Sequence, residues 1–199
     1  IPLPASVGRV CPHPCESDCR RQLVEQPLSI AYLKAFAADN DMKSENPFTP
    51  AVAESTGKRV AIVGGGPAGL TAAYQLAVKG YAVTVMDMMP EMGGMLRYGI
   101  PEYRLPKAVL AAEVKQIEDL GVVMCNNVKV GKDVTLESLR ESYDAVLVAV
   151  GAWKSTGVGC EGDKLEGVLG GIDLLREVNL GGRPDLGKNV AVVGDGNVA

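Results

Sequence analysis

The sequence predicts an α/β protein built on a doubly wound, Rossmann-like parallel sheet. A short apolar run at residues 59–63 ends in Gly64-Gly65-Gly66-Pro67-Ala68-Gly69, and a helix-forming segment follows at once. Strand-like and helix-like segments then alternate as far as residue 151, which is typical of parallel strands joined by helices. A second glycine motif begins at Gly194, again directly after an apolar run.

Hydrophobic periodicity and glycine or proline boundaries place the individual elements. Strands are expected at residues 59–63, 82–87, 122–125, 145–150 and 190–193, and helices at 67–79, 106–120, 135–141 and 171–178. Before them, a short amphipathic helix at 29–36 carries Ile30, Leu33 and Phe36, and a linker at 38–57 follows. We expect three parts: residues 1–56, a first nucleotide-binding domain at 57–158, and a connection with the start of a second, truncated domain at 159–199.

Each glycine of the first motif has a physical role. Gly64 turns the chain tightly, Gly66 allows backbone to approach a pyrophosphate, and Gly69 allows the helix to pack closely on the strand. The start of the helix adds unpaired amides that attract phosphate. Asp87 lies 23 residues after Gly64, at the end of the next strand, where its carboxylate can accept from ribose hydroxyls. The sequence therefore predicts an adenine dinucleotide site formed by Gly64, Gly65, Gly66, Pro67, Ala68, Gly69 and Asp87.

The second motif, Gly194-Asp195-Gly196-Asn197-Val198-Ala199, is a Gly-x-Gly-x-x-Ala variant of the same fingerprint. Two such motifs indicate two nucleotides, usually a flavin and a nicotinamide. A carboxylate at Asp195 would repel a pyrophosphate unless its side chain points away. Because the sequence stops inside this motif, we expect the chain to be a piece of a longer polypeptide.

Composition narrows the function classes. The chain is 47% hydrophobic and 22% charged, with a formal net charge of −4 and acids and bases mixed along it. No stretch concentrates positive charge, so nucleic acid is not expected as a partner. No run approaches the roughly 18 apolar residues of a membrane span, and no leader opens the sequence. A cytoplasmic protein is expected.

Three cysteines, Cys11, Cys15 and Cys19, recur at a four-residue spacing near the N-terminus. Pro12 and Pro14 exclude a regular helix across the first two. Proline beside closely spaced cysteines is typical of loops around iron–sulfur clusters, although a 4Fe–4S cluster takes four thiolates and only three lie here. A disulfide framework and a zinc site completed by His13 are the alternatives.

Several segments resemble the glutamate synthase small-subunit family, which includes the flavin half of dihydropyrimidine dehydrogenase. The resemblance covers nearly the whole chain, in the family's order. The segments that carry it are Gly8-Arg9-Val10-Cys11-Pro12, the first glycine motif, the stretch 93–106 (the most specific), Tyr143 to Gly151, and Val193 to Ala199.

The resemblance implies roles for individual residues. The first motif and Asp87 would hold FAD, with Gly94, Met95 and Leu96 passing close to the cofactor. Arg104 would contact its phosphates, Val130 would meet the adenine through its backbone, and Gly151 would end the strand that leads to the flavin. The NADPH or NADH pyrophosphate would lie on Gly194, Asp195, Gly196, Asn197 and Val198. Cys11, Cys15 and Cys19 would be divided between two 4Fe–4S clusters, with the remaining ligands upstream.

Simpler interpretations stand beside these roles. Arg97 and Arg104 could be surface cations, with Arg104 paired to Glu102. The acids and lysines of the 106–120 helix would form a solvated face. The sequence also departs from the family pattern at Val7, where a further cysteine is common, and at Lys34, where some members offer Glu or Gln as a ligand.

The implied activity is that of a flavin-dependent NAD(P)H oxidoreductase subunit. It would pass electrons from NAD(P)H through FAD to iron–sulfur clusters and a partner subunit that carries the final acceptor site. Two alternatives remain: an electron-transfer or scaffold subunit without NAD(P)H turnover, and a nucleotide-sensing module.

Overall fold

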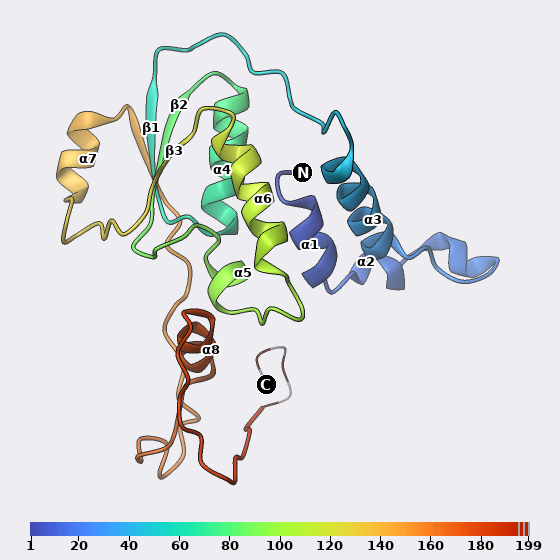
Figure 1. Ribbon diagram of the computed structural model, residues 1–199, viewed down its shortest axis with the longest axis vertical. Helices are drawn as coiled ribbons and strands as arrows, with labels where there is room; N and C mark the ends of the chain where they lie inside the picture. The colour runs from blue at the N-terminus through green and yellow to red at the C-terminus, as the bar shows by residue number, and fades with distance from the viewer. Residues whose placement is uncertain (195, 197, 199) are drawn as a thin grey trace.

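The computed structural model describes residues 1–194, 196 and 198, and Figure 1 shows how they are arranged. A helical segment at the N-terminus lies beside an α/β body, and the chain after residue 150 extends away from that body. The N-terminal segment holds α1 (Pro4–Val10), α2 (Pro14–Ser17), the 3₁₀ helix η1 (Arg20–Leu23) and α3 (Ile30–Lys43).

The α/β body is built on four parallel strands in the order β3-β2-β1-β4, as the sequence predicted for a doubly wound sheet. The strands are β1 (Arg59–Val63), β2 (Ala82–Met86), β3 (Val123–Cys125) and β4 (Ala145–Val148). β1 lies in the middle, with Val60 opposite Val83 on one side and opposite Ala145 on the other. The strand order therefore reverses at β1, and ligands of such sheets bind beyond the carboxyl ends of the strands at that point.

Helices cover the sheet on both faces, α4 and α6 on one and α7 on the other (Figure 1). The helices of the body and of the chain after it are α4 (Pro67–Val78), α5 (Met95–Tyr98), α6 (Lys107–Glu118), α7 (Leu136–Ser142) and α8 (Gly171–Asn179). Side chains alternate along β1, so Val60 and Ile62 join the core with Leu70 and Leu110 on one face of the sheet. On the other face, Ala61 and Val63 pack with Leu139 of α7.

The N-terminal helices differ from expectation in length and in packing. α3 runs to Lys43, so the expected linker from Ala38 begins several residues too early. Its apolar residues Leu33 and Phe36 are 56% and 68% exposed, and small residues face inward instead. The cause is the approach of α1, since a Cβ on Gly8 would lie 2.8 Å from Cα of Ala35. Backbones this close leave no room for large side chains between them.

The expected strand at 190–193 is absent, which corrects the sequence interpretation. Val190, Val192 and Val193 are 59%, 66% and 75% exposed, and no other described strand pairs with this run. A β-strand requires a hydrogen-bonded neighbour, so an apolar alternation by itself does not form one. None of the helices among the described residues is both long and apolar enough to cross a lipid bilayer.

Candidate functional site

The first glycine motif forms a tight turn between β1 and α4. Gly64 adopts φ +110°, and a Cβ there would collide with the carbonyl oxygen of Ala149 at the end of β4. Its amide donates to the carbonyl of Met86 at 2.8 Å. A Cβ on Gly69 would in turn collide with the carbonyl oxygen of Gly64, so α4 packs directly on the turn. Both glycines are required by contacts within the protein.

Gly66 is different, because it faces space that the protein leaves open. It is the N-cap of α4 with φ −79°, and an added Cβ would meet only Cα of Gly94, at 3.8 Å. No side chain caps this helix end, and Pro67 occupies its first turn. The amides that follow, at Ala68 and Gly69, are those that a helix leaves without an intrahelical partner. Such an end fits a pyrophosphate.

Asp87 follows β2 and is only 8% exposed. Its Oδ2 accepts from the backbone amide of Gly65 at 2.6 Å, and its Oδ1 accepts from that of Met89 at 2.8 Å. Each carboxylate oxygen can accept a second hydrogen bond. Asp87 therefore holds the glycine turn and can still accept hydrogen bonds from ribose hydroxyls. A carboxylate in this position fits the adenosine end of FAD.

A cleft of about 120 Å³ opens beside Asp87 at the carboxyl edge of the sheet. It is lined by Val63, Gly64, Met86, Asp87, Met88, Val128, Lys129, Val130, Val150 and Trp153. The cleft brings Val130, which the resemblance would place against the adenine, together with Gly64 of the glycine turn. Sequence reasoning missed Lys129 and Trp153. Gly151, with φ +70°, follows β4 but is not among the lining residues.

The stretch after β2 is fastened to the glycine turn. The amide of Gly93 donates to the carbonyl of Gly65 at 2.8 Å, and a Cβ on Gly94 would lie 2.6 Å from Cα of Gly66. Gly94 and Met95 therefore begin α5 directly beside the start of α4. Leu96 is 8% exposed and belongs to the hydrophobic core, so its side chain packs inward.

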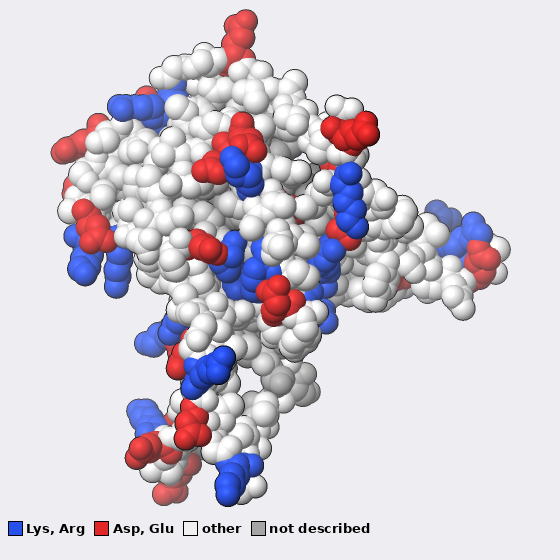
Figure 2. Space-filling model, viewed as in Figure 1, with Lys and Arg blue, Asp and Glu red and all other residues white. Residues whose placement is uncertain are grey.

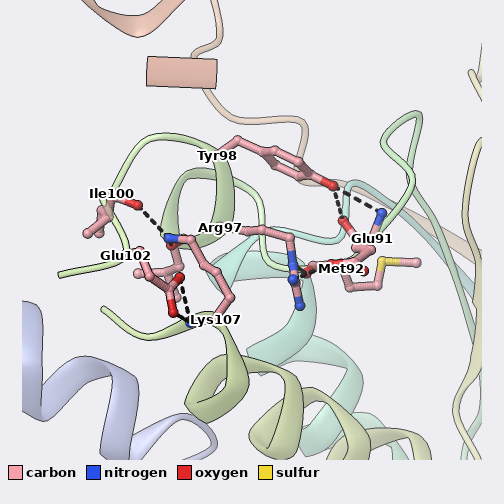
Figure 3. Close-up of polar contacts among 8 residues, drawn as sticks. Glu91, Met92, Arg97, Tyr98, Ile100, Glu102 and Lys107 are labelled. Atoms are coloured by element: carbon pink, nitrogen blue, oxygen red, sulfur yellow. Dashed lines mark hydrogen bonds and ion pairs between the residues drawn. The ribbon is translucent and has the colours of Figure 1, made fainter. Parts of the chain in front are cut away.

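Figure 3 shows the side chains that hold this stretch from within. Nζ of Lys107 donates to the carbonyls of Leu96, at 3.2 Å, and Ile100, and burial lowers the pKa of Lys107. Arg97 pairs with Glu91 and donates from Nε to the carbonyl of Met92 at 2.7 Å. Arg97 and Lys107 are thus partly buried anchors, which corrects the interpretation of Arg97 as a surface cation and of Lys107 as part of a solvated face.

Arg104 is exposed and takes part in no ion pair within the residues that the structure describes. The alternative pairing of Arg104 with Glu102 does not form among the described residues, and Glu102 instead accepts from the amide of Lys107 at the start of α6. Sequence reasoning also missed Glu113, which is fully buried on α6. Its spacing from Leu110 and Ile117 places it on the core face of the helix, and this signal was available in the sequence.

The three N-terminal cysteines lie in separate turns. As predicted, the prolines interrupt the helix, with α1 ending at Val10 and α2 beginning at Pro14. Sγ of Cys11 accepts from the amide of His13 at 3.4 Å. The backbone amides of Leu28 and Arg21 lower the pKa of the Cys19 thiol.

Such amide contacts suit thiolate ligands, but they do not make a complete cluster site. No three metal-ligating side chains come together in the described part of the chain. The described residues therefore supply individual ligands at most, and His13 does not complete a zinc site with them.

Of the second motif, Asp195, Asn197 and Ala199 lie outside the described residues. Gly194 has φ +131°, and Val198 approaches α8, where a Cβ on Gly171 would lie 2.8 Å from Cγ1 of Val198.

Figure 2 shows one face of the molecule, on which acidic and basic side chains are interspersed.

Comparison with known proteins agrees with this geometry. Residues 58–199 match the family described as pyridine nucleotide-disulphide oxidoreductase, and residues 1–46 match that described as dihydropyrimidine dehydrogenase domain II, 4Fe-4S cluster. These two matches bear out the expected cofactor classes, FAD, NADP and a 4Fe–4S cluster.

Individual relatives are similar over most of this chain. The β subunit of NADP(+)-dependent formate dehydrogenase from Moorella thermoacetica is 46% identical over 99% of the chain and 31% of its own length. The NADPH glutamate synthase small chain of Bacillus subtilis (strain 168) is 37% identical over 87% of the chain and 35% of its own length. The solved structure of Mycobacterium tuberculosis FprA in complex with NADPH is 31% identical, with a TM-score of 0.55, covering 61% of this chain and 29% of that one. The chain thus spans about a third of the length of these curated relatives.

Proposed function

Because the chain belongs to the pyridine nucleotide-disulphide oxidoreductase family, we propose that residues 57–158 bind FAD at the carboxyl edge of the sheet. The observation that carries the proposal is the hydrogen bond from the amide of Gly65 to Oδ2 of Asp87, with an N–O distance of 2.6 Å. It lies beside the start of α4 at Gly66, which no side chain caps. This arrangement offers acceptors to a ribose and amides to a pyrophosphate at neighbouring points. Val130 and Trp153 would enclose the adenosine end in the cleft.

The residues of this chain would bind and orient the cofactor. Gly64 and Gly69 shape the turn, Gly66 admits the phosphates, and Asp87 fixes the ribose. Gly94 and Met95 would pass along the cofactor, because α5 begins against Gly66. The bound flavin would supply hydride acceptance from NAD(P)H, whose own site would begin at residues 194–198.

In the complete protein, we propose that electrons received from NAD(P)H leave through the iron–sulfur segment, residues 1–56, toward a partner subunit. Support comes from two relatives, the β subunit of an NADP(+)-dependent formate dehydrogenase and the small chain of an NADPH glutamate synthase, each of which is one subunit of an NADP-linked enzyme. For this chain we propose the role of the subunit that takes electrons from NAD(P)H, of which the glutamate synthase type is one form. The alternative is a subunit that keeps the flavin but does not oxidise NAD(P)H.

The test uses the purified full-length protein. Denaturation followed by chromatography should release FAD, and anaerobic addition of NADPH or NADH should bleach the bound flavin. FAD that is released but not bleached by either nucleotide would favour the alternative subunit. A folded full-length protein that releases no flavin, and takes up none when FAD is added, would overturn the proposal.

A further inference from the structure

The geometry points to Glu113 as a positioning residue that fixes the cysteine-bearing helix α1 on the dinucleotide domain. This inference rests on the proposed function for its consequence, although not for its geometry. Glu113 lies on α6, contacts neither the glycine turn nor the cleft, and has no exposed surface. A buried carboxylate is costly unless it is hydrogen-bonded, so its contacts require an explanation.

Both oxygens of Glu113 bind the start of α1. Oε1 accepts from the amide of Ala5 at 2.6 Å, and Oε2 accepts from the amide of Ser6 at 3.0 Å. These are among the first amides of a helix, which have no intrahelical partner. The helix offers no cap of its own, since its N-cap residue, Leu3, makes no side-chain hydrogen bond to these amides. The cap of α1 therefore comes from a residue 108 positions away in the sequence.

Apolar contacts hold the same two helices together around this carboxylate. Leu3 is 2% exposed and shares the hydrophobic core with Leu110 and Ile117 of α6, and Val7 packs against that core. Figure 1 shows α1 lying beside α6. Apolar packing tolerates sliding, whereas two hydrogen bonds from one carboxylate to two successive amides fix the register of the pair.

The far end of α1 leads directly to the first cysteine. The helix ends at Val10, and the amide of Cys11 donates to the carbonyl of Val7 at 2.9 Å. On the other side, Arg9 pairs with Asp39 of α3 at 2.8 Å. Seven residues of helix, roughly 10 Å, thus connect the buried carboxylate of the α/β body to Cys11.

This connection has a consequence for the proposed electron path. The rate of electron transfer between two centres falls steeply with their separation, and the protein's contribution is to hold them in place. Loss of the Glu113 cap would loosen α1 without touching the glycine turn. Hydride acceptance at the flavin would then continue normally, while delivery of electrons to the partner would slow.

The experiment compares Glu113→Gln and Glu113→Leu with the matched control Glu118→Gln in the full-length protein. Glu118 lies on the same helix, but it is exposed and paired with Lys115. Glutamine keeps one carbonyl acceptor and leucine keeps none, so the effects should increase in that order. The first measurement is amide hydrogen exchange, which requires no bound cofactor. Exchange across residues 4–11 should rise about tenfold in Glu113→Leu, and less in Glu113→Gln, while residues 59–78 keep their protection.

The second measurement separates positioning from general damage. The rate of flavin bleaching by NAD(P)H should stay within about twofold of wild type, whereas reduction of the partner should fall about tenfold, since small misplacements of reacting centres have large effects on rates. The control should change neither rate. Unchanged exchange across 4–11 in Glu113→Gln would overturn the inference, as would an equal fall in both rates. If the wild type binds no flavin, the proposed function fails, and the exchange arm still decides whether Glu113 anchors α1.

Discussion

Oδ2 of Asp87 lies 2.6 Å from the backbone nitrogen of Gly65, so the acid after β2 is hydrogen-bonded to the glycine turn after β1. The same carboxylate accepts from the amide of Met89 at 2.8 Å, which closes the turn that follows β2. One side chain thus organises both walls of the candidate ribose site. Loss of its charge should therefore affect cofactor binding more than its small exposed surface suggests.

We expect Asp87→Asn to weaken FAD binding about tenfold, which is about 1.4 kcal/mol. Asparagine retains one acceptor oxygen for two backbone donors, and its NH₂ group would face an amide that also donates. Titration of the flavin-free protein with FAD, followed by flavin fluorescence, measures the change.

The control for this variant is Asp144→Asn. Oδ2 of Asp144 accepts from the amide of Arg59 at 2.8 Å, so it also binds the backbone of β1, but at the opposite end of the strand. The FAD affinity of this control should equal that of wild type. If both variants weaken FAD binding equally, the loss of affinity comes from a disturbed β1 strand and not from the lost ribose contact.

Gly66→Ala and Gly69→Ala should separate binding from folding. A Cβ on Gly66 would meet nothing closer than 3.8 Å, so the free energy of unfolding of Gly66→Ala should lie within about 1 kcal/mol of the wild-type value. Its affinity for FAD should nevertheless fall about tenfold or more, because the methyl group occupies the space left for phosphate.

Gly69→Ala should lower the folding stability by about 3 kcal/mol, because its Cβ would collide with the carbonyl oxygen of Gly64. Urea unfolding and FAD titration measure the two effects. An unchanged affinity in Gly66→Ala would contradict the proposed phosphate site.

The sheet could be predicted from sequence because its signals are local. Apolar runs at 59–63 and 82–86, bounded by glycine and acid, lie where two layers of helices bury them. The run at 190–193 carries the same signal and forms no strand, because strand formation depends on a neighbour that no local pattern supplies.

Side-chain roles were harder to predict where they depend on contacts far along the chain. Glu113 was expected to face solvent, since acids on helices usually do, yet its partners lie 108 and 107 residues away. Leu33 and Phe36 had the spacing of a buried stripe, but the close approach of Gly8 to Ala35 turned them outward. For Leu33 and Phe36 the tertiary packing overrides the local pattern, whereas the spacing of Glu113 from Leu110 and Ile117 already indicated the core face of α6.

Arg97→Ala should mainly lower the stability of the protein, whereas Arg104→Ala should mainly lower its affinity for FAD. Arg97 donates to the carbonyl of Met92 and its side chain is 12% exposed, so its loss should cost about 2 kcal/mol of stability. Arg104 is exposed, so its removal should change stability by at most about 0.5 kcal/mol. If Arg104 contacts the phosphates, its removal should weaken FAD about tenfold. Thermal unfolding with FAD titration checks both, and an unchanged affinity in Arg104→Ala would remove it from the cofactor site.

Glu113 should make the stability of the protein depend on pH in an unusual direction for a carboxyl group. Burial raises the pKa of Glu113 above its ordinary value of 4.5, although the side chain and amide of Ser6, the amide of Ala5 and the charge of Arg9 oppose the rise. The folded state therefore binds this proton more tightly than the unfolded state, and the stabilisation is complete below pH 4.5 and declines as the pH rises through the folded-state pKa. The unfolding free energy of wild type minus that of Glu113→Gln should accordingly fall as the pH rises above 4.5. Urea unfolding at several pH values measures this difference, with Glu118→Gln as the control. A difference that grows with pH would mean that the Ser6 side chain, the two amides and Arg9 outweigh burial, and that the carboxylate is ionised throughout.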